Sequence, residues 1–412
     1  MIRSMYAAVS GLRAHQTMMD VVGNNIANVN TNGFKKSNVI FQDILSQTIK
    51  GASAPNDIVG GTNSAQIGLG AQVGSVAQNF LQGALQSTGR DLDLAIQGDG
   101  FFNLEQDGQQ RYTRSGAFFV DANGNLVGGE GGFVQGWTAD EDGAINISGE
   151  AGRIRIPAGE QIAPIVTSEI RLGGNLPSDS NVGDVHITSL NVFDAQGATA
   201  DLTLTFTKSA INTWQLSATH GDPATPVAIA DGTMSFDAGG QLVGPADFDA
   251  NIAAGGIPGL GAISIAVGGE RGGPVTQLAA LGSVAAITQN GSATGQLSGV
   301  TVGQDGVITG SYSNGQVKAI AQVGVASFAN PEGLERVTGT KFLASANSGL
   351  AQLGTAGSGG RGQVAPGSLE MSNVDLAEEF TNLIRTQRGF QANSRVITTS
   401  DEMLQEIVNL KR

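Results

Sequence analysis

The acidic side chains of two short stretches come nearest to a catalytic or metal-binding set. The stretch DANGN at 121–125 spaces oxygen ligands as at the start of a calcium loop, but it lacks the glutamate expected downstream. Asp140, Glu141 and Asp142 could suggest the paired carboxylates of a glycosidase, yet they crowd into one glycine-flanked turn. We interpret the first stretch as a hairpin turn and the second as a solvated loop.

Nucleophilic and cofactor-binding patterns are weaker still. The chain has no cysteine, and its three histidines, His15, His186 and His220, are scattered, which disfavours thiol and zinc chemistry. No serine lies in a G-x-S-x-G motif. The glycine-rich runs at 68–70 and 357–362 lack the lysine and hydroxyl that complete a phosphate-binding loop. The sequence therefore predicts a protein that is not an enzyme and needs no cofactor or metal.

The composition favours a turn-rich β protein. Glycine supplies 61 of the 412 residues, whereas only 5% are aromatic and 14% charged. The formal net charge of −14 argues against nucleic-acid binding, because phosphates would be repelled. No apolar run reaches the ~20 residues of a membrane span. The opening residues do not read as a cleaved signal peptide, because Arg13 and His15 interrupt the apolar stretch.

Both ends of the chain have a helical pattern. Their apolar residues recur at alternating spacings of three and four, which places them on one helix face, here called the apolar seam. The N-terminal seam comprises Ile2, Met5, Val9, Leu12, Met19 and Ile26. The C-terminal seam comprises Leu376, Phe380, Leu383, Gln387, Phe390, Ile397, Leu404 and Val408. Two coiled-coil-like helices follow, which pair only with each other or also with neighbouring copies.

The second helix has its own start signal. Asp375 with Glu378 three residues later is a plausible N-terminal cap. From there the helix would run about 50 Å at ~1.5 Å per residue. A helix of that length needs other elements to cover its apolar seam.

The middle of the chain reads as β-structure. Apolar and polar residues alternate there between glycine-containing turns. One predicted hairpin buries the alternating side chains Leu202, Leu204, Phe206, Trp214, Leu216 and Ala218. Asn123-Gly124 and Asn314-Gly315 predict two further hairpin turns, because glycine takes a positive φ at no steric cost.

These patterns predict a nested layout. The glycine-rich stretches 51–68 and 348–367 read as irregular connections. The predicted parts are a terminal helical core (1–30 and 372–412), a connecting segment (31–71 and 359–371), an inner β domain built from both halves of the chain (72–145 and 286–358) and an inserted outer β domain (146–285).

The asparagine-rich stretch NNIANVNTNGFKK at 24–36 closes the first helical pattern. Asn28 is expected to bond its own backbone, Gly33 to stop the helix and Phe34 to anchor the returning chain. Asn24 and Asn25 precede that turn and lie off the seam. We predict that these two amides bond across subunits.

The same stretch resembles the N-terminal signature of the bacterial flagellar rod and hook protein family. The stretch 372–410, with Gln387-Arg388, Phe390, Asn393 and the run DEML, is similar to the family's C-terminal signature. IGLGAQVGSV, TGRDLDLAIQGDGFFNL and RYTRSGAFFVDANGNLV also resemble family segments, in the expected order. The length and the central stretches NVFDAQGATADLTLTF and YSNGQVKAIAQVGVASFANPEGL resemble the hook members rather than the shorter distal rod members.

The resemblance implies a structural protein whose many copies assemble helically into a curved tube, a universal joint that transmits torque from rod to filament. Its implied partners are further copies, the rod and hook-filament junction proteins, the hook cap and the type III export apparatus. The implied location is the extracellular flagellum, reached without a cleaved signal. The alternatives are a distal rod protein and, in a different class, a secreted β-rich glycan-binding protein or enzyme.

Overall fold

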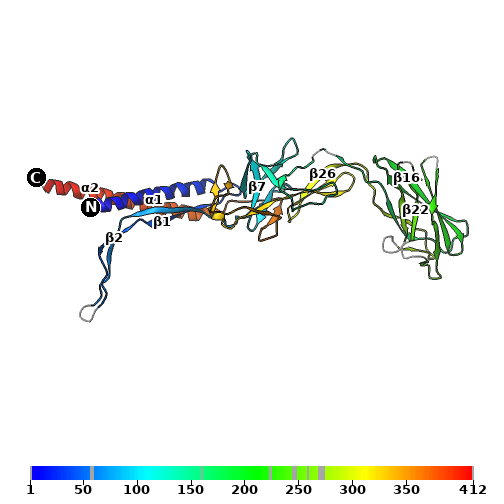
Figure 1. Ribbon diagram of the computed structural model, residues 1–412, viewed down its shortest axis with the longest axis horizontal. Coiled ribbons are helices and arrows are strands. Elements are labelled where there is room, and N and C mark those ends of the chain that lie inside the picture. The colour runs from blue at the N-terminus through cyan, green and yellow to red at the C-terminus, as the bar shows by residue number, and fades with distance from the viewer. Residues whose placement is uncertain are drawn as a thin grey trace. The chain divides into compact units, whose positions relative to one another are not determined.

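The computed structural model describes residues 2–55, 60–157, 159, 161–221, 225–243, 248–257, 259–267 and 274–410. In these residues one helix lies near each end of the chain and β-strands fill the middle (Figure 1). The predicted class, mainly β with helical termini, is confirmed. As far as the described residues show, neither helix has the length and apolar character needed to cross a membrane.

The chain divides into two compact units. Unit 1 consists of Met1–Ile156, Val300–Thr309 and Ala319–Arg412, and unit 2 of Pro157–Gly299 and Gly310–Lys318. The strands β26 (Gly295–Val302), β27 (Val307–Tyr312) and β28 (Val317–Val323) carry residues of unit 1 and unit 2. The finer boundaries given above for four parts stay predictions.

The helices of unit 1 lie close to the residues predicted for them. Helix α1 (Ile2–Ala27) stops at the asparagine-rich turn, and α2 (Leu376–Leu410) spans 35 residues, or about 52 Å. The Asp375 carboxylate accepts a 2.8 Å hydrogen bond from the Ala377 amide, so the predicted N-cap is present. The two helices run side by side, with the chain ends marked near one another (Figure 1).

Two strand pairs follow α1 in the sequence, and we call residues 37–78, which contain them, the β-arm. β1 (Ser37–Asp43) pairs antiparallel with β4 (Ala71–Gln78), and β2 (Ser46–Lys50) with β3 (Ala65–Gly68). The prediction that 348–367 is irregular was wrong at β32 (Gln352–Gly354) and β33 (Gln363–Pro366). The same prediction for 51–68 was wrong at β3. Its side chains are exposed, so no buried face imposed the alternation by which strands are recognised.

The remaining strands of unit 1 come from both halves of the chain. They are β5 (Leu85–Ser87), β6 (Leu94–Gln97), β7 (Phe101–Gln106), β8 (Gln109–Thr113), β9 (Phe118–Val120), β10 (Leu126–Gly128), β11 (Phe133–Thr138), β12 (Gly152–Arg153), β29 (Val325–Ser327), β30 (Glu335–Arg336), β31 (Lys341–Leu343), β32 (Gln352–Gly354), β33 (Gln363–Pro366) and β34 (Ser368–Glu370). β29 pairs with β7, β31 with β8, β33 with β6 and β34 with β5. An aromatic cluster of Phe80, Phe101, Tyr112, Phe328 and Phe342 packs edge to face beside them.

Unit 2 contains two six-stranded sheets that share one hydrophobic core. Its strands are β13 (Gln161–Ile162), β14 (Glu169–Asn175), β15 (Val185–Phe193), β16 (Thr199–Ala210), β17 (Thr213–His220), β18 (Thr225–Val227), β19 (Ile229–Ala230), β20 (Thr233–Phe236), β21 (Leu242–Val243), β22 (Phe248–Ile252), β23 (Ile263–Val267), β24 (Val275–Thr276) and β25 (Ala285–Gln289). The predicted hairpin is β16–β17, where Phe206 pairs with Leu216 and both are buried.

The stretch DANGN forms the predicted hairpin turn between β9 and β10. The Asp121 carboxylate accepts hydrogen bonds from the Asn123 and Asn125 amides, each 2.8 Å, and Gly124 has a φ of 84°. The hydrogen bond from the Asn125 side chain is the main reason why the pKa of Asp121 lies below its ordinary value. This carboxylate closes a turn.

Candidate functional site

Helices α1 and α2 contact each other in an antiparallel register. The side chain of Asn25 reaches Glu379. Two glycines bring the helices close together, because a Cβ atom added at Gly11 would lie 2.8 Å from the Asn393 side chain. A Cβ added at Gly389 would lie 2.6 Å from the His15 ring. His15, for which no catalytic role was predicted, therefore lies within the helix contact.

The face of α2 that contacts α1 carries a polar residue at every seventh position. It consists of Glu379, Thr386, Asn393 and Ser400, here called the contact strip. Glu379, Thr386 and Ser400 are buried. Thr386 donates to the Asn382 carbonyl at 2.6 Å, and Asn393 to the Gly389 carbonyl at 3.0 Å. Thr386 and Asn393 are thus bonded within α2, whereas Glu379 accepts a hydrogen bond from Asn25 of α1. Polar groups line the contact between the helices.

The apolar seams lie beside this contact. Phe380 and Gln387 each follow a contact-strip residue by one position, which is about 100° around the helix. The seam residues Leu383, Phe390, Ile397 and Leu404 each follow one by four positions, which is about 40° around it. Of the seam residues, the structure leaves these exposed: Val9, Leu376, Phe380, Gln387, Phe390 and Val408. It leaves these partly buried: Met5, Leu12, Met19, Ile26, Leu383, Ile397 and Leu404. Asn393 of the contact strip is also partly buried. The side chain of Ile2 lies outside the described residues. The close contacts between the helices at Gly11 and Gly389 lie at or beside the contact strip, so pairing of the two helices through their seams is not confirmed. The role of the seams in self-assembly stays a prediction.

Asn25 is fully used inside the chain. It is 2% exposed, and its amide donates to the Ser37 carbonyl at 2.9 Å and to the Glu379 carboxylate at 3.2 Å. Its oxygen accepts a 3.0 Å hydrogen bond from the Ser37 amide. The predicted intersubunit bond of Asn25 is thereby corrected, since its donors and its acceptor already tie α1 to β1 and α2. Asn24 is exposed and accepts from Asn28 at 2.6 Å.

Replacing Asn25 by alanine is expected to lower the free energy of unfolding of unit 1 by about 1–3 kcal/mol, because Ser37 and Glu379 lose buried partners. Asn24→Ala is the matched control, with an expected change within about 0.5 kcal/mol. Urea unfolding of each variant, monitored by hydrogen exchange of residues 20–40, measures both changes in the free energy of unfolding. Equal losses in the two variants would contradict this assignment.

The rest of the asparagine-rich stretch forms a turn and the predicted anchor, but α1 already ends at Ala27, so Gly33 does not stop the helix as predicted. The Asn28 side chain donates to the Asn24 carbonyl at 2.9 Å. Gly33 has a φ of 70°, and its amide donates to the Glu370 carbonyl at 2.7 Å. Phe34 is 1% exposed, with the Arg336 guanidinium 4.4 Å from its ring centre. The turn thus fixes the chain leaving α1 to the segment that enters α2.

Three buried charges lie where these two segments meet. Lys35 Nζ is 2.7 Å from one Glu370 oxygen, and Arg114 Nη1 is 3.5 Å from the other. Burial lowers the pKa of the Lys35 ammonium and of the Arg114 guanidinium, while the Glu370 carboxylate opposes both shifts. The same carboxylate accepts a 2.8 Å hydrogen bond from the Gly83 amide. We call Lys35, Arg114 and Glu370 the charge cluster.

Sequence reasoning missed the charge cluster. The lysine pair after Gly33-Phe34 was the available signal, because two charges follow directly on a residue expected to be buried. Nothing in the local pattern marks Arg114 or Glu370, which lie in other parts of the chain.

A second set of bonds extends the junction to the start of α2. The Lys36 amide donates to the Asn373 side chain at 2.8 Å, and Lys36 Nζ lies 2.7 Å from Glu378. Asn373 in turn donates to the Asn79 carbonyl at 2.8 Å. Glu378, expected to take part in the helix cap, is therefore paired with Lys36.

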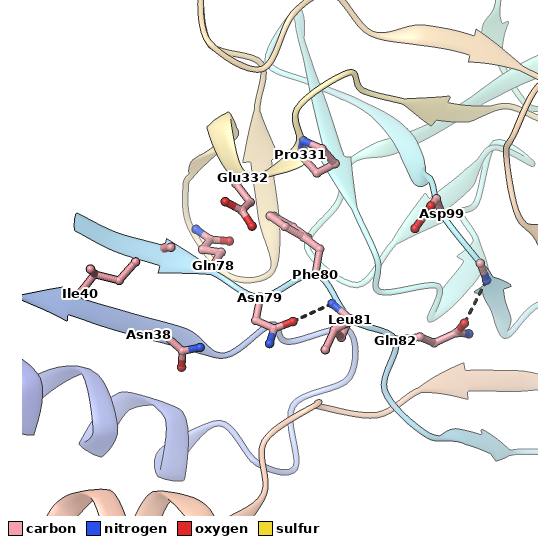
Figure 2. Close-up of a pocket in the computed structure, with 12 residues that line it drawn as sticks. Asn38, Ile40, Gln78, Asn79, Phe80, Leu81, Gln82, Asp99, Pro331 and Glu332 are labelled. Atoms are coloured by element: carbon pink, nitrogen blue, oxygen red, sulfur yellow. Dashed lines mark hydrogen bonds between the residues drawn. The ribbon is translucent and has the colours of Figure 1, made fainter. Parts of the chain in front are cut away.

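An open pocket of about 590 Å³ lies next to this junction (Figure 2). Phe80 and Pro331 supply apolar surface, and Asp99 and Glu332 supply carboxylates. A 2.9 Å hydrogen bond from the Leu81 amide to the Asn79 side chain shapes one wall (Figure 2). Such a lining offers apolar contacts and hydrogen-bond acceptors to another polypeptide segment.

Comparison with known protein families gives four matches along the chain. Residues 5–35 match the family described as flagella basal body rod protein, and residues 95–167 the flagellar hook protein FlgE/F/G D1 domain. Residues 174–306 match the flagellar basal body protein FlaE D2 domain, and residues 365–410 the C-terminal family of the flagellar basal body rod FlgEFG proteins.

Full-length relatives agree with these matches. The flagellar hook protein FlgE of Treponema pallidum is 38% identical, and that of Borreliella burgdorferi 39%, with all of each chain covered. The flagellar basal-body rod protein FlgG of Bacillus subtilis is 34% identical, again over both complete chains. The crystal structure of the Helicobacter pylori flagellar hook protein FlgE2 covers 69% of this chain and 100% of its own, with a TM-score of 0.52 and 14% identity, which is a likeness of fold alone.

Proposed function

The chain belongs to the family of the flagellar hook protein FlgE, and from this membership we propose how it builds a hook. It is a structural subunit of the flagellar hook rather than an enzyme. Many copies assemble helically into a curved tube, which serves as a universal joint and transmits torque from rod to filament. Contacts that do not close on themselves generate such helical polymers.

The exposed apolar seam of α2 carries this proposal. Helix α2 already contacts α1 through the polar contact strip. On its seam, Phe380 is 50% and Phe390 36% exposed. Exposed apolar side chains in a row along a helix favour association with another protein surface. Neighbouring copies are the natural source of that surface in a polymer. The paired terminal helices would then complete a coiled coil with helices of other copies.

The four predicted parts suit distinct tasks in such a polymer. The terminal helices form its core, and residues 31–71 with 359–371 connect that core to the inner β domain. The inserted outer β domain, 146–285, makes weak contacts that can be exchanged during bending. Support comes from the polar, aromatic-poor composition of the chain.

Further partners follow from the flagellar family. We propose contacts with rod proteins, hook-filament junction proteins and the hook cap, and delivery by the type III export apparatus without a cleaved signal. The hook lies outside the cell, as part of the flagellum. A distal rod protein is the second candidate, favoured by the full-length match to FlgG. The position of labelled protein in purified basal bodies, in the hook or in the rod, distinguishes a hook protein from a distal rod protein.

Electron microscopy of the purified chain under polymerising conditions tests the proposal. We expect curved tubes from the full chain and none from chains lacking 1–29 or 376–412. Both truncated chains should retain the β-sheet signal of the remaining strands, since unit 2 lies outside the deleted residues. Normal tubes from both truncated chains would contradict the proposal that the terminal helices build the polymer.

A further inference from the structure

A groove runs between α1 and the base of the β-arm. It has a volume of about 520 Å³, and its lining includes Tyr6, Val9 and Arg13 of α1 and Ile44, Leu69 and Val73 of the arm. Tyr6 is 71% exposed, and Val9, Ile44 and Leu69 are exposed as well. The groove therefore presents apolar surface with a cation at its rim.

The walls of the groove are fixed to each other. Ser10 donates to the Ala7 carbonyl at 2.8 Å and accepts from the Ala71 amide at 3.3 Å. Gly70 has a φ of 129°, and a Cβ atom there would collide with the Ser10 side chain. The arm is thus held against α1, and the groove exists before any partner arrives.

The end of α2 lacks a counterpart on α1. Because Gly11 faces Asn393 and His15 faces Gly389, the register places Ile2 opposite Glu402. The following residues to Leu410, here called the α2 overhang, run on past the start of α1. Met403, Ile407 and Val408 are exposed there, and the spacing of four places Met403 and Ile407 on one side.

The overhang also carries negative charge, which is complementary to the arginine at the rim of the groove. Glu402 and Glu406 flank its apolar residues, and both are exposed. Arg13 is exposed at the groove, and no ion pair of its guanidinium is found within the described part of the chain. An apolar stripe with acidic flanks therefore complements an apolar groove with a basic rim.

We infer that the α2 overhang of one copy seats in the α1-arm groove of a second copy. The same chain cannot supply it, because Val9 faces the region of Arg395, about 18 Å along α2 from Ile407. Each copy offers one groove and one overhang at different places, so the contact repeats from copy to copy without closing. This inference rests on the proposed polymer and names one contact within it.

Site-specific cross-linking tests the contact, since the chain has no cysteine of its own. Copies with Val9→Cys are mixed with differently tagged copies with Ile407→Cys, polymerised and treated with a short bis-maleimide. We expect a cross-linked pair that joins the two tags, confirmed by peptide mapping. Gly23→Cys is the matched control, because Gly23 is exposed, has open space beside it and lies about 21 Å further along α1.

Charge reversal gives an independent test. Arg13→Glu should raise the concentration needed for polymerisation about tenfold, and Glu406→Arg in the same chain should restore it. Tubes that form without a Val9–Ile407 cross-link, or that cross-link Gly23→Cys equally well, would overturn the inference and leave the proposed function standing. Failure of the unmodified chain to form tubes at all would overturn both.

Discussion

Glu370→Gln is expected to lower the free energy of unfolding of unit 1 by about 3–5 kcal/mol. The Glu370 carboxylate is the shared anion of Lys35 and Arg114, whose side chains are 1% and 2% exposed. A neutral amide leaves these two cations buried beside each other without an anion in the cluster. Burial already lowers the pKa of Lys35, so we expect its ammonium to lose its proton more easily in the variant.

Glu378→Gln is the matched control for this prediction. Glu378 forms an ion pair of the same length with the neighbouring Lys36, but its side chain is 55% exposed. Solvent screens such a pair, so the expected change is within about 1 kcal/mol. Urea unfolding combined with hydrogen exchange of residues 30–40 and 110–118 distinguishes the two variants. A similar small loss in both would show that Glu370 is not the partner that holds the junction together.

The sequence predicted elements whose pattern is local. The β16–β17 hairpin followed from alternation, and the α2 start followed from Asp375 as N-cap, because both signals lie within a few residues of the structure they specify. The Asn123-Gly124 turn was predicted on the same basis. Membership of the flagellar family was likewise legible in the two terminal signatures.

The charge cluster could not be predicted because its members are brought together only by the fold. Lys35 and Glu370 lie at opposite ends of the sequence, and Arg114 reaches them from the end of β8. A lysine or arginine in a sequence is normally expected at the surface. Only long-range pairing, such as that of β34 with β5, shows that these charges are enclosed together.

The helix contact was displaced from its predicted face for a different reason. Apolar periodicity marks the residues that must be covered, but not which surface covers them. Gly11 and Gly389 permit a closer approach on the adjacent face, where small and polar side chains meet. Part of the apolar seam is exposed in the single chain, and we therefore expect it to be the sensitive place for assembly.

Phe390→Asp is accordingly expected to abolish polymerisation while the monomer stays folded. Phe390 is 36% exposed and is not among the buried core side chains of the single chain, so we expect the monomer to tolerate the substitution. In the polymer the seam would be covered, and an aspartate there loses the apolar contact and buries an unpaired charge. A loss of about 2–3 kcal/mol per contact raises the polymerisation threshold roughly a hundredfold. Sedimentation and electron microscopy measure that threshold, and swimming of complemented cells reports the consequence.

Gln391→Asp is the control that distinguishes loss of the apolar seam contact from the effect of an added negative charge. Gln391 is an exposed neighbour on the same helix but lies off the seam, and the substitution adds the same negative charge. If polymerisation depends on covering the seam, Gln391→Asp should assemble near the normal threshold, whereas Phe390→Asp should not. Equal failure of both variants would mean that the added charge, rather than the uncovered seam, prevents assembly. Normal assembly of both would mean that the seam stays exposed to water in the polymer, and the exposed apolar face of α2 would then need another explanation.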